Sequence, residues 1–174
     1  MQDTKMNMMY SESIFRGVKS ATFLDFIRNM EKDTEGIKKH KRFKVLERNE
    51  KGYPSLIYTL SKIPMMTDRE RIARITSKEL DDGARLIITK SEDHPDYPRG
   101  NHAIRTQVFK GTMFYEKDGD LYINEYAQFN MGGYFPMTIL NKLMSTIMSK
   151  IVGKFREKLL KRQEEMESES TNSG

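Results

Sequence analysis

The sequence predicts an α+β protein in which a curved antiparallel β-sheet wraps around one long C-terminal α-helix. Apolar and polar residues alternate in short segments that are separated by tight-turn residues, and a long helical period replaces this alternation after Pro136. An antiparallel sheet needs one covered face, and the long helix is the only predicted element that is large enough to cover it.

The other predicted elements follow one another in a simple order. Ser20 is the expected N-cap of a short helix. Phe23, Leu24 and Ile27 then fall on one face of that helix. In chain order we expect a strand over 6–17, the short helix from residue 20, strands over 43–47 and 55–61, strands over 71–78 and 86–90 with a hairpin turn at Asp81-Asp82-Gly83, a long loop over 92–101, a strand over 103–115 that is kinked near Gly111, and a strand over 121–130 after a turn at 117–120.

The long helix has a wider apolar face than a covering helix needs. Its apolar positions sweep about half of the circumference, whereas a stripe of ~100° is enough to cover a sheet. We interpret the surplus apolar surface as one wall of a cavity that holds an apolar ligand. The positions are Ile139, Leu140, Leu143, Met144, Ile147, Met148, Ile151, Val152, Phe155 and Leu159.

Length and composition indicate one globular domain. A chain of 174 residues with 37% hydrophobic and 32% charged residues supports a single core, which we place in residues 1–163. Residues 164–174 are acidic and are expected to form a disordered tail. No apolar run reaches the roughly 18 residues of a membrane span, no secretory signal layout opens the chain, and cysteine is absent. These features favour a cytoplasmic protein that is peripheral to membranes.

The net charge of +5 is unevenly distributed along the chain. Its densest basic cluster, Lys38-Lys39-His40-Lys41-Arg42, follows the short helix and is expected to lie in a connection. Such a surface attracts anionic lipid headgroups or nucleic acid. A solvated loop is the simpler interpretation of the cluster.

No arrangement of residues indicates catalysis, so we expect a binding protein and not an enzyme. His40, His94 and His102 are scattered, without partners at metal-ligand spacing. Gly132-Gly133 precedes the long helix without a phosphate-binding glycine pattern, so a turn explains the pair better. We therefore expect no metal and no cofactor.

Two adjacent methionines, Met65 and Met66, stand in a connection between strands. Methionine side chains are flexible and polarizable, and they line surfaces that adapt to irregular apolar partners. Pro64 ends the preceding strand, and two apolar side chains in so short an excursion are unfavourable in water. We therefore expect both methionines at the mouth of the cavity, packed on the long helix when the cavity is closed.

Two charged residues, Arg105 and Glu125, occupy strands that should have a buried face. Glu125 shares the face of Leu121 and Ile123. Buried charges usually need a partner, and the two residues lie on consecutive strands. One interpretation is an ion pair that supplies polarity inside the cavity, and a cross-strand pair on the surface fits the pattern equally well.

Four segments together form a recognisable series. The first runs from Ile57-Tyr58 to Pro64 and on through Asp68-Arg69-Glu70-Arg71, the second is the loop 91–98, the third is Ala103-Ile104-Arg105, and the fourth runs from Glu125-Tyr126 through Gly133-Tyr134-Phe135-Pro136 to Leu140-Asn141. In this order they resemble the StAR-related lipid-transfer (START) domains of the helix-grip superfamily. Glu70 stands where that family mostly has Asp, and the resemblance covers about residues 10–155.

The resemblance implies a helix-grip fold around a tunnel for one lipid, gated by the loop matching residues 63–68 and by the C-terminal helix. It implies a phospholipid, sterol or sphingolipid as partner, with transient contact to a membrane surface and no nucleic acid. START domains normally open with a helix and two more strands before the strand at 6–17. We therefore expect a shortened variant, a fragment, or a dimer in which a partner chain completes the N-terminal edge.

Three functional interpretations follow, and the first is favoured. It is the binding of one lipid in an internal hydrophobic tunnel, with transfer between membranes. The second is a helix-grip enzyme or another hydrophobic-ligand protein, of the cyclase or plant stress-protein kind. The third is a basic-surface module for anionic membranes or RNA. For the first, the expected tunnel and gate residues are Tyr58, Met65, Met66, Ile75, Arg105, Glu125, Phe129, Tyr134, Met137, Leu140, Leu143, Met144, Ile147 and Met148.

Overall fold

The computed structural model describes the backbone of residues 7–33, 40–63, 66–100, 102–133 and 137–172, and the side chains of these residues except 7, 137–151 and 172. Its elements, in chain order, are β1 (Asn7–Phe15), α1 (Ser20–Arg28), the 3-10 turn η1 (Met30–Lys32), β2 (His40–Arg48), β3 (Pro54–Ser61), β4 (Arg69–Glu79), β5 (Arg85–Ser91), β6 (Ile104–Arg105), β7 (Gln107–Lys117), β8 (Asp120–Asn130) and α3 (Met137–Asn172).

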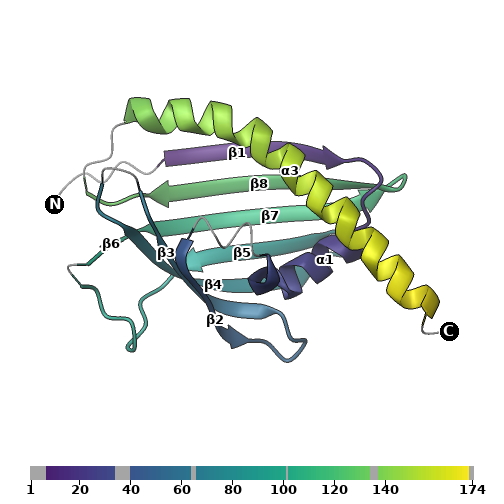
Figure 1. The fold of residues 1–174 in the computed structure, drawn as a ribbon, viewed down its shortest axis with the longest axis horizontal. Helices are drawn as coiled ribbons and strands as arrows, with labels where there is room; N and C mark the ends of the chain where they lie inside the picture. Colours follow the sequence, from purple (N-terminus) through teal and green to yellow (C-terminus); the bar gives the residue numbers. More distant parts are fainter. Residues whose placement is uncertain (1–6, 34–39, 64–65, 101, 134–136, 173–174) are drawn as a thin grey trace.

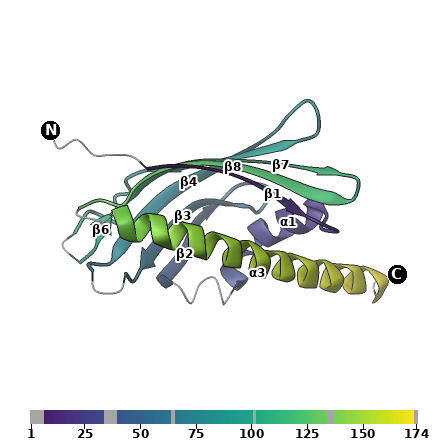
Figure 2. The same ribbon diagram turned by 90° about the horizontal axis from the view of Figure 1, so that it is seen from above.

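The strands form one curved sheet in the order β1-β8-β7-β5-β4-β3-β2, with every neighbouring pair antiparallel. The short strand β6 pairs in parallel with β4. Both α1 and α3 lie on the concave side, and α3 crosses that side diagonally from the start of β1 to a point beyond α1 (Figures 1 and 2). This arrangement confirms the predicted α+β architecture of a curved sheet around a long C-terminal helix.

Both faces of the sheet carry a hydrophobic cluster. On the concave face, Phe23 of α1 and Leu159 of α3 pack against strand residues such as Phe114. On the convex face, Leu56, Tyr58 and Ile72 pack beneath Tyr97 of the loop that follows β5. The strand β3 is therefore buried on both faces, which explains its nearly continuous apolar sequence.

Two strand boundaries differ from the sequence prediction. The expected strand over 103–115 is broken at Thr106 and not at Gly111, because β6 pairs with β4 whereas β7 pairs with β5 and β8. The backbone N–H and the hydroxyl of Thr106 both donate to the Glu70 carbonyl, at 2.9 and 3.1 Å. The described part of the basic cluster, residues 40–42, belongs to β2 and not to a connection.

The first turn of α1 is capped by other elements. Ser20 is the first helical residue and not the N-cap, which is Lys19 without a capping side chain. The backbone N–H of Lys19 donates to Gln163 Oε1 at 2.9 Å, and that of Ser20 donates to Glu116 Oε2 at 2.8 Å. Because these acceptors come from α3 and β7, forming α1 is coupled to docking of the long helix.

The helix α3 continues to Asn172, where the sequence predicts a disordered tail from about Gln163. Its acidic residues pair with a cation of α3 and with the N-cap residue of α1. Arg162 pairs with Glu165 at 3.2 Å, and Lys19 pairs with Glu167 at 2.9 Å. The Arg162–Glu165 pair has the i, i+3 spacing that stabilises a helix, and the acidic segment is helical as far as Asn172.

A buried carboxylate, Glu70, connects the convex face to the loop above it. Its Oε1 lies 3.0 Å from Arg105 Nη2, and both side chains are almost fully buried. Burial, followed by the adjacent Glu70 carboxylate, raises the pKa of the Tyr58 hydroxyl, which donates to Glu70. Arg105 also donates to the Tyr97 carbonyl at 2.7 Å. The proposed pair between Arg105 and Glu125 is thus wrong, because the two side chains point to opposite faces of the sheet.

We predict that Arg105→Ala lowers the free energy of unfolding by about 3–5 kcal/mol, because it removes the buried arginine that neutralises the Glu70 carboxylate. Arg99→Ala is the matched control, since Arg99 is exposed and pairs with an exposed carboxylate of the same loop, Asp93. Equilibrium unfolding in urea measures both values. A loss below about 1 kcal/mol for Arg105→Ala would contradict this account of the convex face.

Candidate functional site

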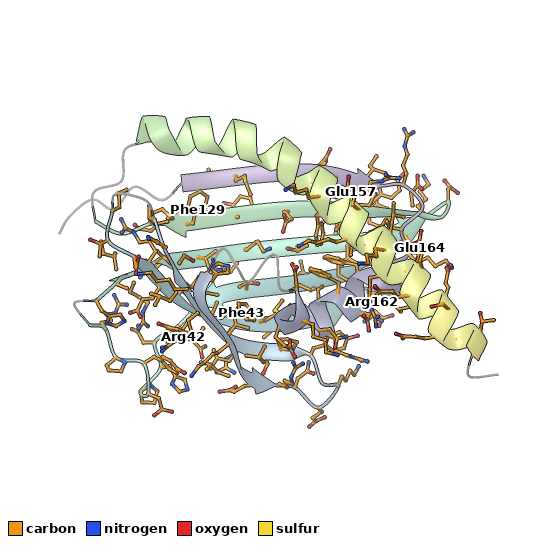
Figure 3. All side chains as sticks on the ribbon, viewed as in Figure 1. Arg42, Phe43, Phe129, Glu157, Arg162 and Glu164 are labelled. Atoms are coloured by element: carbon orange, nitrogen blue, oxygen red, sulfur yellow. The ribbon has the colours of Figure 1, made fainter. Side chains whose placement is uncertain are left out.

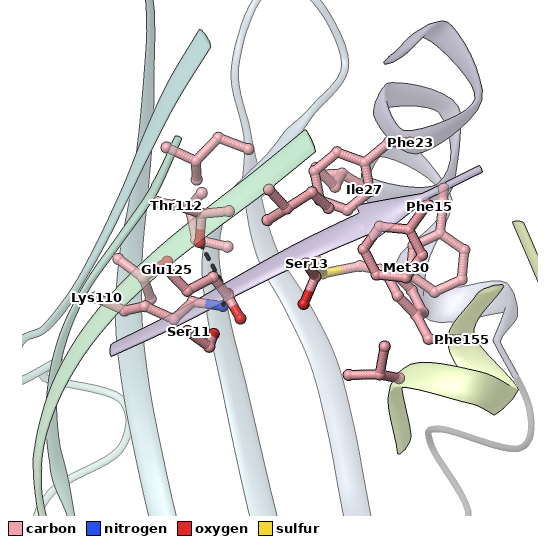
Figure 4. Close-up of a pocket in the computed structure, with 16 residues that line it drawn as sticks. Ser11, Ser13, Phe15, Phe23, Ile27, Met30, Lys110, Thr112, Glu125 and Phe155 are labelled. Carbon is pink, nitrogen blue, oxygen red and sulfur yellow. Dashed lines mark hydrogen bonds and ion pairs between the residues drawn. The ribbon is translucent and has the colours of Figure 1, made fainter. Parts of the chain in front are cut away.

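A cavity of about 280 Å³ lies between the concave face of the sheet and the two helices (Figure 4). Strand residues form its floor, and side chains of α1, η1 and α3 form its opposite wall. The lining residues are Ser11, Ser13, Phe15, Phe23, Phe26, Ile27, Met30, Ile75, Ile87, Thr89, Lys110, Thr112, Ile123, Glu125, Val152 and Phe155.

One end of the cavity is built from aromatic rings. Phe155 of α3 makes edge-to-face contacts with Phe15, Phe23 and Phe26, with ring centroids 5.7, 6.2 and 5.1 Å apart. Phe23 meets Phe114 of β7 in the same geometry at 4.8 Å. These contacts anchor α1 and α3 to the sheet and leave an apolar wall that cannot satisfy a buried polar group.

The other end of the cavity carries a polar group of three residues. Lys110 Nζ lies 2.8 Å from Glu125 Oε1, and the Thr112 hydroxyl donates to the same oxygen at 3.0 Å. Ser11 on β1 is paired with Glu125 in the sheet register, and its side chain also lines the cavity. Figure 4 shows these polar side chains on one side and the phenylalanines on the other. The cavity therefore suits an amphiphile with an apolar body and hydrogen-bonding groups.

The structure brings some of the sequence-predicted residues to this cavity. Ile75 and Glu125 line it. Phe129 lies further along β8 on the same face as Glu125, at the end of the sheet where α3 begins (Figure 3). Met66 is half-buried, and its backbone N–H donates to the Ile63 carbonyl at 3.2 Å.

Tyr58 and Arg105 are placed elsewhere. Tyr58 stacks on Tyr97 at 4.6 Å on the convex face, where Arg105 also lies. Alternation along a strand separates its two faces but does not indicate which of them lines the cavity. The remaining predictions fall outside the described side chains, namely those for Met65, Tyr134, Met137, Leu140, Leu143, Met144, Ile147 and Met148.

Sequence reasoning missed the contribution of β1. Ser11, Ser13 and Phe15 face the cavity, whereas Met8 and Ile14 point to the convex side and are exposed. The alternation in β1 is thus reversed relative to an ordinary amphipathic strand, with small polar residues inside. Lys110 and Thr112 were missed for a similar reason, because their face becomes evident only once β7 is registered against β8.

Within the part of the chain that the structure describes, no three His, Asp or Glu side chains come close enough to hold a metal ion. Over the same residues, neither helix has a stretch that is long and apolar enough to cross a membrane.

Comparison with known proteins identifies the fold. No protein-family model and no curated protein sequence matches the chain. Among solved structures, human STARD10 matches with a TM-score of 0.79 at 17% identity, over 98% of this chain and 70% of that one. A STAR-related lipid transfer protein from Xanthomonas axonopodis matches with a TM-score of 0.72 at 13% identity, over 91% and 89% of the two chains.

A third match is human StAR-related lipid transfer protein 5, with a TM-score of 0.65 at 13% identity, over 92% of this chain and 77% of that one. The chain therefore has the START, or helix-grip, fold that the four sequence segments indicate.

The aromatic wall should determine how firmly α3 is held. We predict that Phe155→Ala lowers the free energy of unfolding by about 2–4 kcal/mol, because it removes three ring contacts from a half-buried position. Glu164→Ala is the control, since Glu164 is exposed on the same helix (Figure 3). Urea unfolding of both variants provides the measurement. Equal free energies of unfolding for Phe155→Ala and Glu164→Ala would show that α3 is held by other contacts.

Proposed function

We propose that this chain binds one lipid in the cavity between the sheet and its helices and carries that lipid between membranes. The observation that carries the proposal is the composition of the cavity, which is aromatic and aliphatic at one end and polar at the other. Lipids have this same division, and their apolar part gains roughly 25 cal/mol for each Å² removed from water.

The polar end of the cavity supports this proposal in a second way. The Lys110–Glu125 pair is half-buried and already neutral as a whole, so it offers hydrogen bonds without demanding a charged ligand. Hydroxyl, ester or amide groups of a lipid are suitable partners for the ammonium group and for the serine side chains of β1. Such groups give orientation, while the apolar wall supplies most of the affinity.

The size of the cavity supports occupancy by a single lipid. A volume of about 280 Å³ is near the lower limit of the ~300–1,000 Å³ that is usual for ligand pockets. One lipid would fill this cavity with part of its length and extend along the concave face toward β3. The solved structures of the same fold include proteins named for lipid transfer, and this supports carriage rather than catalysis.

Transfer also requires contact with a membrane. The exposed residues Lys41, Arg42 and Lys62 lie at one end of the β2–β3 pair, beside the loop that contains Met66. Bases near an anionic membrane surface contribute about 1 kcal/mol each. We propose that this end of the sheet touches the membrane and that Met65 and Met66 form part of the gate.

We predict that the purified protein takes up one lipid per chain from mixed liposomes and that Ser13→Phe reduces uptake at least about fivefold, because the added ring occupies the cavity. Ile14→Phe is the matched control, since the neighbouring side chain is exposed on the convex face. Native mass spectrometry counts the bound lipids. Unliganded wild-type protein across phospholipids, sterols and sphingolipids would overturn the proposed function.

A separate prediction concerns transfer. Replacing Met65 and Met66 together with Asp should slow lipid exchange between anionic vesicles several-fold, since carboxylates oppose contact with such a surface. Met8→Asp is the control, because Met8 is 69% exposed on the convex face of β1. Fluorescent lipid transfer between vesicles gives the rates, and thermal melting verifies the fold. Transfer at the wild-type rate would show that this loop is not the gate.

A further inference from the structure

Arg71 is a cation on the concave face of the sheet. Side chains of one strand alternate between faces, and β4 is paired without interruption to β3 and β5. Ile75 of β4 lines the cavity, whereas Ile72 packs in the convex cluster. Arg71 is four residues from Ile75 and so shares its face, on the same side of the sheet as α3.

Among the described residues, the Arg71 side chain has no hydrogen-bond or ion-pair partner, and its Nε atom is buried. Burial lowers the pKa of its guanidinium below the usual value. The neighbouring arginines of β4 are satisfied: Arg69 donates to the Met131 carbonyl at 2.8 Å, and Arg74 donates to Glu92 on the convex face at 2.6 Å.

Few carboxylate side chains that are able to neutralise Arg71 occur in the segments whose side chains the structure does not describe. Residues 134–151, which lead into and begin α3, contain no Asp or Glu. Across all segments whose side chains are not described, the only carboxylate side chains are Asp3 and Glu35. The residue facing Arg71 on β3 is Thr59, which is uncharged.

A buried guanidinium without an anion is unfavourable, and it becomes favourable when a planar or tetrahedral oxyanion binds it through two hydrogen bonds. We infer that the lipid is anionic and that its phosphate or carboxylate group binds Arg71. This inference rests on the proposed function and adds the chemical class of the lipid.

The position of Arg71 fits the charged end of such a molecule. At ~3.3 Å per residue, Arg71 lies about 13 Å from Ile75 along β4, toward the end of the sheet where Met66 lies. Ile75 is level with Thr89 and Lys110 across the sheet, and the aromatic wall lies beyond them. A long-chain lipid would thus place its anion at Arg71 and its tail between the phenylalanines.

The test compares two lipids that differ only in the presence of a phosphate group. Binding of dioleoylphosphatidic acid, dioleoylglycerol and inorganic phosphate is measured by titration of the wild-type protein and of Arg71→Met. We expect the wild type to bind dioleoylphosphatidic acid at least about tenfold more tightly than dioleoylglycerol. Arg71→Met should bind both lipids equally, at the wild-type affinity for the neutral one.

The melting temperature is a second readout. It distinguishes an unpaired arginine from an arginine in an ordinary structural ion pair. Because the unpaired charge opposes folding, the lipid-free Arg71→Met variant should melt about 2–4 °C higher than the lipid-free wild type. Arg74→Met is the matched control on the same strand, and it should leave the lipid preference unchanged because Arg74 faces the convex side.

Each contrary result has a distinct meaning. Equal affinity of the wild type for both lipids overturns the anionic assignment and leaves the proposed function standing. Failure to bind either lipid also overturns the anionic assignment, and uptake of lipid from mixed liposomes then decides the proposed function. Binding of inorganic phosphate as tight as that of phosphatidic acid, and lost in Arg71→Met, overturns the lipid headgroup in favour of a small-anion site. A lower melting temperature for lipid-free Arg71→Met would show that Arg71 has a protein partner.

Discussion

The curvature of the sheet is the constraint on which the rest of the molecule depends. A bent sheet of seven antiparallel strands, with the short β6 beside β4, has a concave face larger than α1 and the crossing helix α3 cover (Figures 1 and 2). Contacts around Phe155 and Leu159 close one end of that face. Toward the other end, the same face carries hydrogen-bonding and charged side chains. A ligand that is apolar at one end and polar at the other completes such a surface.

Most residues that carry the sequence resemblance build the frame of the molecule, and among those that the structure describes only Glu125 lines the cavity. Glu70 and Arg105 meet on the convex face, and Arg69 donates to the carbonyl oxygens of Met131 and Gly132 before α3. Gly132 has a φ of 66°, and a Cβ there would lie 2.5 Å from Ile104 Cγ2. The four segments thus meet at one end of the sheet, which explains why they indicate the fold while saying little about the ligand.

The fold was more predictable than the site because strand periodicity and turn residues are local. Alternation located β3, β4, β5 and β8 to within a few residues, and the helical period located α3. The cavity depends on which face each strand presents, and this is set by partners distant in sequence. Glu125 was found because its neighbours are apolar, whereas the inward serines of β1 look like surface residues. The partners of Arg105 and the cap of α1 by Gln163 are likewise long-range contacts.

The most direct test of lipid binding in the cavity is to locate the bound acyl chain by NMR. In protein with labelled isoleucine methyl groups, nuclear Overhauser effects to an acyl chain should involve Ile75, Ile87 and Ile123, which line the cavity. The exposed methyl group of Ile14 on the convex face should give none. Contacts from Ile14 without contacts from the three cavity residues would show that the lipid binds to the outside of the sheet and would contradict the account.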